Sequence, residues 1–344
     1  MGAIRKERVI RQRDARRGAG RSTKGLARFQ IRGPPPSTRG SARRAEDAVP
    51  NSPSHAYPSK EAVIAAGDPR YGKRRMSVTR NRPYVCDVLA PSEQTWPAVL
   101  WLVRHGESAG NVARTVAESG GLPLIELAQR DVDVPLSTTG TGQARALGRW
   151  FKHQPPTGQP TVVFSSPYVR AMQTSALIVE GVQAPHPMVQ IVDERLREKE
   201  FGILDRLTKA GIVARFPAEA ARRQETGKFY YRPPGGESWC DVILRLRSVL
   251  DSIQLQYRRE RVLIVAHQVV VLCFRYLLER MNEEQILRID AEKDVANCSV
   301  TTYEFTRDVE HRGEMSLRCY NFVAPLTDAS EPVTREPDVP AGGR

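Results

Sequence analysis

Two arginines and two histidines each follow a short apolar stretch of the sequence. Arg104 and His105 follow the first such stretch, Arg170 lies shortly after the second, and His267 follows the third. Guanidinium groups match phosphate oxygens in a bidentate manner, and a neutral imidazole is a good nucleophile. Any one of these residues alone is more often structural. Together, at three strand ends, they predict a phosphate-binding site.

The apolar stretches are typical of strands that are buried on both faces. They cover residues 98–103, 161–164 and 262–266. The carboxyl ends of parallel strands meet at one edge of a sheet, so these strands would bring the four side chains together. We expect helices over 139–153, 168–180, 237–257 and 269–278, and further strands over 188–192, 299–305 and 315–320. This alternation predicts a three-layer α/β/α sandwich with a mixed, mainly parallel sheet.

Six ordered segments carry a more specific pattern. They are Arg104-His-Gly-Glu-Ser108 with Asn111, Leu136-Ser-Thr-Thr-Gly140 through Ala144, Ser165 through Thr174, Leu196 through Gly202, Gly235-Gly-Glu-Ser238 and Val265-Ala-His267. In this order they resemble the histidine phosphatase (phosphoglycerate mutase-like) superfamily. The resemblance covers roughly residues 98–305, and it implies the fold of that superfamily.

The resemblance also implies a role for each matching residue. His105 would be the nucleophile that becomes phosphohistidine, and Arg104, Arg170 and His267 would hold the phosphoryl oxygens. Glu198 would donate a proton to the leaving oxygen and then act as a base toward water. Fixed cations can stabilise the charge on the phosphoryl oxygens, so we expect neither a metal ion nor a cofactor.

Two further assignments depend on the family pattern. Family members place the acid four residues before a glycine, and this spacing selects Glu198 before Gly202 over its neighbours Glu194 and Glu200. Asn111 would line the pocket near the nucleophile.

The sequence departs from the mutases of this superfamily. After Asn111 they carry a short loop with Arg, Thr and Gly, whereas residues 112–135 are longer and different here. The mutases follow their acid with Arg-His-Tyr-Gly, where this chain has Lys-Glu-Phe-Gly at 199–202. We therefore expect a phosphatase that acts on a small phosphorylated metabolite. The alternative is a cofactor-dependent phosphoglycerate mutase.

The segment 228–238 resembles the corresponding segment of fructose-2,6-bisphosphatases, and so does Gln268 after the second histidine. Lys228, Tyr231 and Arg232 are therefore candidate contacts, with Gln268, for a sugar or a second phosphate. Equally, the aromatic and basic stretch could merely pack over the entrance. We expect two insertions, at about 112–136 and 203–235, to cap the site.

The net charge of +13 comes from the N-terminal quarter of the chain. Residues 1–95 contain 21 Lys and Arg against 8 Asp and Glu, which leaves 31 of each kind elsewhere. The neutral remainder argues against a nucleic-acid partner for the folded part. A second alternative function is a non-catalytic phosphatase-like module tethered by a basic arm, against which the intact set of site residues argues.

Composition divides the chain into three parts. Residues 1–95 are predicted to be a disordered basic extension, residues 96–324 the phosphatase domain and residues 325–344 a flexible tail. The extension could be a solvated tail, a binding arm, an organellar address or read-through sequence ahead of a true start at Met76. No apolar run is long enough to span a membrane, and five scattered cysteines favour reduced thiols in a cytoplasmic protein.

Overall fold

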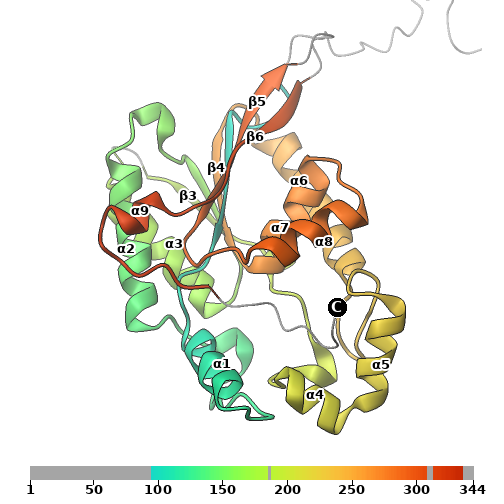
Figure 1. The fold of residues 1–344 in the computed structure, drawn as a ribbon. Coiled ribbons are helices and arrows are strands. Elements are labelled where there is room, and N and C mark those ends of the chain that lie inside the picture. The colour runs from blue at the N-terminus through green and yellow to red at the C-terminus, as the bar shows by residue number, and fades with distance from the viewer. Residues whose placement is uncertain (1–93, 185–186, 308–312, 336–344) are drawn as a thin grey trace, which may run out of the picture. The chain divides into compact units, whose positions relative to one another are not determined.

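The computed structural model describes residues 94–184, 187–307 and 313–335, and the predictions for residues 1–93 and 336–344 lie outside them. Within these ranges, six strands form one sheet in the order β3-β2-β4-β1-β5-β6 (Figure 1). Strands β3, β2, β4 and β1 are parallel, and β5 and β6 extend the sheet in antiparallel fashion. The strands are β1 (Val99–Arg104), β2 (Val162–Ser165), β3 (Val189–Val192), β4 (Arg261–Ala266), β5 (Val300–Arg307) and β6 (Gly313–Phe322). The predicted mixed, mainly parallel sheet is confirmed.

Successive residues of the buried strands pack against helices on opposite faces of the sheet. Leu100 and Leu102 of β1 share an apolar cluster with α6, α7 and α8, whereas Trp101 and Val103 share another with α2, α3 and α9. These helices are α2 (Thr138–Lys152), α3 (Val169–Val182), α6 (Trp239–Gln256), α7 (Gln268–Leu278), α8 (Glu283–Glu292) and α9 (Ala324–Thr327). The apolar residues on both faces explain why the strand sequences are continuously hydrophobic. The predicted three-layer sandwich is confirmed.

The sequence prediction has no counterpart for several helices, and two of them show why. Helix α1 (Ala109–Ser119) buries Ala117 alone, and α8 buries Ile286 alone. Helix prediction relies on a repeating apolar face, and a helix that buries one residue lacks that face. Both helices instead begin with a capping box, formed in α1 by Ser108 and Asn111.

The two predicted insertions pack against each other at the carboxyl edge of the sheet. The first contains most of α1 and the 3-10 helix η1 (Asp131–Asp133), and the second contains α4 (Lys209–Arg215) and α5 (Pro217–Thr226). Backbone hydrogen bonds join them, from Ile125 N to Arg206 O at 2.9 Å and from Thr208 N to Pro123 O at 3.2 Å. The insertions therefore support each other as one unit.

The domain boundary predicted at residue 324 lies inside α9. Leu326 is fully buried against the α2 and α3 face of the sheet. Beyond it, Thr334 Oγ1 donates a hydrogen bond to Asn297 Oδ1 at 3.0 Å and accepts one from Gln143. The first residues of the predicted flexible tail thus pack against the domain as far as Thr334. Among the helices of the described ranges, none combines the length and the apolar character that a membrane span requires.

Candidate active site

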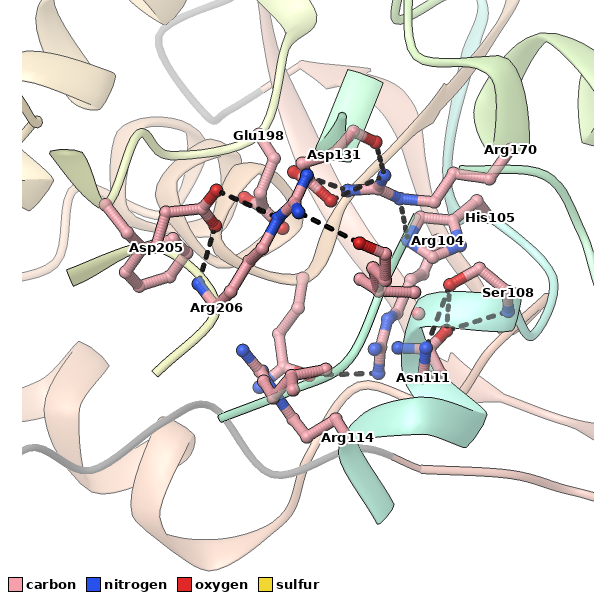
Figure 2. Close-up of a pocket in the computed structure, with 15 residues that line it drawn as sticks. Arg104, His105, Ser108, Asn111, Arg114, Asp131, Arg170, Glu198, Asp205 and Arg206 are labelled. Carbon is pink, nitrogen blue, oxygen red and sulfur yellow. Dashed lines mark hydrogen bonds and ion pairs between the residues drawn. The ribbon is translucent and has the colours of Figure 1, made fainter. Parts of the chain in front are cut away.

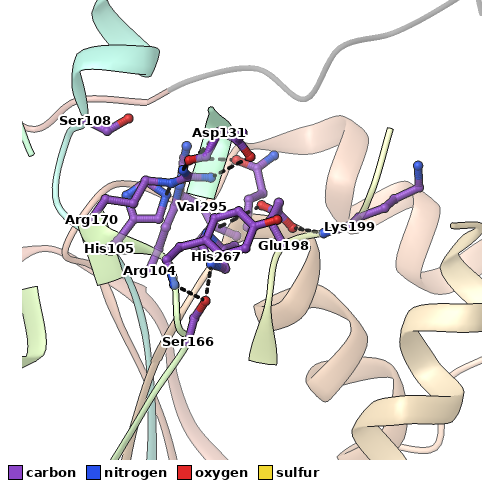
Figure 3. Close-up of polar contacts among 12 residues, drawn as sticks. Arg104, His105, Ser108, Asp131, Ser166, Arg170, Glu198, Lys199, His267 and Val295 are labelled. Atoms are coloured by element: carbon purple, nitrogen blue, oxygen red, sulfur yellow. Dashed lines mark hydrogen bonds and ion pairs between the residues drawn. The ribbon is translucent and has the colours of Figure 1, made fainter. Parts of the chain in front are cut away.

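The carboxyl ends of β1, β4 and β2 meet at one edge of the sheet and carry the predicted residues. Arg104 ends β1 and His105 follows it, His267 follows β4 and caps α7, and Arg170 lies in the first turn of α3 after β2. His105 N–H donates to Ala266 O at 2.9 Å, which joins the ends of β1 and β4. The structure brings these four side chains together, as the strand-end pattern predicts (Figure 3).

The surroundings of His105 fix the protonation of its ring. Nδ1 lies 2.7 Å from the carbonyl oxygen of Gly106, which can accept only, so Nδ1 carries the proton. Nε2 then presents a lone pair, and it accepts a hydrogen bond from Arg170 Nε at 3.3 Å. Burial, and then the charges of Arg170 and Arg104, hold the pKa of His105 well below 6.5. A neutral ring with a lone pair on Nε2 is the nucleophilic form of histidine.

His267 is fully buried beside His105, with 5.1 Å between the ring centroids. Its Nε2 lies 2.8 Å from Ser166 Oγ, and its Nδ1 lies 4.0 Å from Glu198 Oε2. Among the described residues, Nδ1 has no hydrogen-bond partner. Burial, the charge of Arg170 and the neighbouring His105 keep the pKa of His267 well below 6.5. The ring is therefore neutral, with one edge directed toward the site.

Arg104 is held in place by Gln268, the residue that follows His267. Its Nη1 donates to Gln268 Oε1 at 3.0 Å and to the carbonyl oxygen of Val295 at 2.5 Å. Gln268 Nε2 in turn donates to Asp294 Oδ1 at 3.0 Å. Gln268 lines the pocket, where the sequence placed it, and it also orients a predicted phosphate-binding guanidinium.

Arg170 contacts an acidic residue that the sequence analysis did not identify. Its Nη1 donates to the carbonyl oxygen of Asp131 at 2.6 Å and to Asp131 Oδ1 at 3.0 Å, and its Nη2 donates to Asp131 Oδ2 at 3.3 Å. Asp131 belongs to η1 in the first insertion. The guanidinium therefore bridges the imidazole of His105 and the carboxylate of Asp131 (Figure 2).

Glu198 lines the pocket from a loop that several contacts hold in place. Its Oε1 accepts from Lys199 N–H at 2.8 Å, and its carbonyl oxygen accepts from Arg245 at 3.3 Å. The competing acids lie elsewhere: Glu194 is exposed, and Glu200 Oε1 accepts from Tyr168 OH at 3.1 Å. The geometry therefore agrees with the family spacing that selects Glu198.

Apart from His267, which lies behind His105, these side chains line one pocket between the sheet edge and the insertions (Figure 2). Asn111 also lines it, and its Oδ1 accepts a hydrogen bond from Ser108 N–H at 2.9 Å. The insertions contribute residues such as Arg114, Asp205 and Arg206, so they cap the site as expected. Burial and the nearby Asp131 carboxylate raise the pKa of Asp205.

Comparison with known protein families identifies the family to which a chain with this pocket belongs. A model of the histidine phosphatase superfamily, branch 1, matches residues 100–312, which is more than half of the chain. The chain belongs to the histidine phosphatase superfamily. This confirms the resemblance that the six sequence segments indicate.

Relatives of this histidine phosphatase include both mutases and phosphatases. The 2,3-bisphosphoglycerate-dependent phosphoglycerate mutase 2 of Gloeobacter violaceus is 30% identical over 224 residues, or 64% of this chain and 92% of that protein. The 6-phosphofructo-2-kinase/fructose-2,6-bisphosphatase of Gallus gallus is 31% identical over 189 residues, or 55% of this chain and 34% of that protein. The alignment with this bifunctional relative thus spans about a third of its length. Among solved structures, a mycobacterial glucosyl-3-phosphoglycerate phosphatase in complex with VO3 has 26% identity and a TM-score of 0.51, covering 65% of this chain and 99% of that one.

Three predicted contacts of the histidine phosphatase lie outside the pocket lining. Lys228 Nζ pairs with Asp290 at 2.6 Å, and Arg232 pairs with Asp241. Tyr231 is buried in an apolar cluster of the second insertion, and its hydroxyl donates to Glu219 at 2.8 Å. The structure thus favours the packing interpretation of this stretch over direct contact with substrate.

Most of the pocket residues that the sequence did not reveal come from the insertions. Arg114 lies one helical turn after Asn111, so both side chains lie on the same face of α1. This spacing would have indicated Arg114 as a pocket residue only if a helix had been predicted there. Asp131 and Arg206 have no such signal because their positions depend on how the insertions pack. Within the described ranges, no three His, Cys, Asp or Glu side chains are grouped as metal ligands would be.

Proposed function

We propose that this histidine phosphatase hydrolyses a small phosphomonoester through a phosphohistidine intermediate on His105. The observation that carries the proposal is the buried, neutral ring of His105, whose Nε2 lone pair lies against the Arg170 guanidinium. Cationic groups beside a nucleophile attract the anionic phosphoryl group and stabilise its charge during transfer.

In the first step, Nε2 of His105 attacks phosphorus and the bond from phosphorus to the ester oxygen breaks. Glu198, in its protonated form, gives its proton to the leaving oxygen, which departs as an alcohol. Arg104, Arg170 and His267 surround the nucleophile and would donate hydrogen bonds to the phosphoryl oxygens. The products are an alcohol, a phosphohistidine and a Glu198 carboxylate.

In the second step, water attacks phosphorus and the bond to Nε2 breaks. The Glu198 carboxylate takes a proton from the water, and inorganic phosphate leaves. His105 returns to its neutral form with the proton still on Nδ1, because the Gly106 carbonyl continues to hold it. Both steps use the same groups, so one pocket serves the complete cycle.

The names of the relatives support a sugar phosphate or a similar metabolite as the substrate. The bisphosphatase relative and the mycobacterial phosphatase are both named for phosphorylated sugar compounds. A phosphoglycerate mutase is the second candidate, because a mutase relative aligns over 92% of its own length. A mutase would convert 3-phosphoglycerate only when 2,3-bisphosphoglycerate is present, whereas a phosphatase would release inorganic phosphate without it.

Hydrolysis of an aryl phosphate tests the proposal directly. We expect His105→Ala to lower kcat by more than about 10³-fold and to lose the ³²P label that the wild-type chain acquires, because the nucleophile is gone. His153→Ala removes an exposed histidine at the end of α2 and should leave both readouts unchanged. Full activity in a folded His105→Ala variant would refute the phosphohistidine mechanism.

A further inference from the structure

The carboxylate of Asp131 occupies the edge of Arg170 that is suited to gripping a phosphoryl group. Both terminal nitrogens of the guanidinium donate to it, Nη1 to Oδ1 at 3.0 Å and Nη2 to Oδ2 at 3.3 Å. Such a paired contact is the geometry in which a guanidinium binds two oxygens of a phosphate. The remaining nitrogen, Nε, donates to Nε2 of His105, the atom that attacks phosphorus in the proposed mechanism. In Figure 2 the Asp131 carboxylate lies against the terminal nitrogens of Arg170, the donors that a bound phosphoryl group would need.

From this contact, and on the basis of the proposed function, we propose that Asp131 competes with the substrate phosphoryl group for Arg170. A carboxylate and a phosphate dianion repel each other, so both cannot share one guanidinium edge at low cost. Binding of substrate therefore requires the Asp131 side chain to leave Arg170. By this competition, Asp131 sets the affinity of the site for phosphate.

The surroundings allow this displacement. The Asp131 side chain is 41% exposed, whereas the Arg170 side chain is 8% exposed. The carboxylate can therefore rotate into solvent while the guanidinium stays in the site. Solvation of the released carboxylate recovers part of the lost interaction, because only the Asp131 side of the pair is open to solvent.

Asp131 also contacts Arg170 through its backbone, so the experiment must separate competition with phosphate from positioning of Arg170. Its carbonyl oxygen accepts from Arg170 Nη1 at 2.6 Å, and this contact survives any change of side chain. If Asp131 mainly positions Arg170, loss of its carboxylate should weaken phosphate binding. If Asp131 competes with phosphate, loss of the carboxylate should strengthen binding. The two roles predict opposite signs.

Inorganic phosphate, used as a competitive inhibitor of aryl phosphate hydrolysis, provides the test. We expect Asp131→Asn to lower the Ki of phosphate about tenfold, because a charge-assisted pair no longer has to be broken before phosphate binds. Asp133→Asn is the matched control. Asp133 lies in the same 3-10 helix with a 43% exposed side chain, and it pairs with Arg130 at 2.7 Å instead. Its substitution should leave the Ki unchanged.

Each outcome bears on one of the two proposals. A Ki that is unchanged or higher in folded Asp131→Asn, with normal wild-type hydrolysis, overturns the competition and leaves the proposed function intact. An equal fall in Ki for Asp133→Asn also overturns it, since a general effect of charge would then explain the result. Absence of hydrolysis and of phosphate binding in the wild-type chain would reject the proposed function, and the competition with it.

Discussion

At the residue scale, the candidate site relies on two neutral imidazoles buried beside guanidinium groups. Burial and positive neighbours both disfavour a protonated ring, so the pKa values of His105 and His267 lie well below 6.5. A neutral ring has one proton, and the neighbouring groups decide which nitrogen carries it. The Gly106 carbonyl decides this for His105. For His267, the deciding neighbour is Ser166.

The Ser166 hydroxyl can direct the proton of His267 toward the pocket. Ser166 Oγ accepts a hydrogen bond from Tyr168 N–H at 3.3 Å, so its own proton is available for His267 Nε2 at 2.8 Å. A ring that accepts at Nε2 carries its proton on Nδ1, the nitrogen nearer Glu198. Nδ1–H would then be a donor for a phosphoryl oxygen, and Ser166 would be a positioning residue.

We expect Ser166→Ala to lower kcat about 10-fold to 100-fold with a smaller change in KM, because the donor on His267 is no longer fixed. The ¹⁵N spectrum of the His267 ring should shift toward a mixture of tautomers. Ser165→Ala is the control, since Ser165 Oγ donates to the Ser166 carbonyl instead of to a ring. A wild-type kcat together with a single tautomer in Ser166→Ala would contradict the assignment.

The sequence could predict the part of the site that lies at strand ends. Arg104, His105 and His267 follow apolar strands directly, so the strand pattern alone brings them to one edge. Asp131 could not be predicted in the same way, because its contact with Arg170 depends on the packing of an insertion. Tyr231 is a residue that the sequence suggested for the site and that the structure places in an apolar cluster instead. The sequence alone does not distinguish an aromatic side chain that contacts substrate from one that packs in a core.

At the element scale, the sheet and the positions of the two capping insertions could be predicted, but the way the insertions pack against each other could not. Strands such as β1 and β4, which are buried on both faces, have a continuous apolar pattern, but this pattern does not give the order of the strands in the sheet. The insertions contain short helices such as α4 (Lys209–Arg215), whose location is determined by contacts with another insertion. Gly211 shows how close that contact is. A Cβ built on it would lie 1.9 Å from the carbonyl oxygen of Pro123.

We expect Gly211→Ala to separate the two insertions and to destabilise the chain by about 1–3 kcal/mol, as overpacking does elsewhere. The KM for aryl phosphate should rise, since both insertions line the pocket, while the strand-end residues keep their places. Val213→Ala on the same helix is the control, because Val213 is 51% exposed. Denaturant unfolding and steady-state kinetics measure the two effects. Wild-type values of both in Gly211→Ala would show that the insertions do not act as one unit.

At the scale of the whole molecule, the buried histidines link the site to the stability of the fold. The folded chain keeps both rings neutral, whereas an unfolded chain protonates them near pH 6.5. Below that pH, unfolding therefore takes up protons, and the free energy of unfolding falls as the pH falls. The arrangement that prepares a nucleophile at neutral pH thus makes the folded chain sensitive to acid.

We expect the free energy of unfolding to be roughly 2–3 kcal/mol lower at pH 5.5 than at pH 7.5, about half from each ring. Denaturant unfolding at both pH values measures this difference. In His105→Asn one titrating ring is gone, so the pH-dependent loss should fall by about half. In His153→Gln, where the ring removed is exposed, the loss should equal that of the wild-type chain. If the loss were the same in His105→Asn as in the wild type, His105 would not be held neutral by the fold, and the link between nucleophile and stability would be wrong.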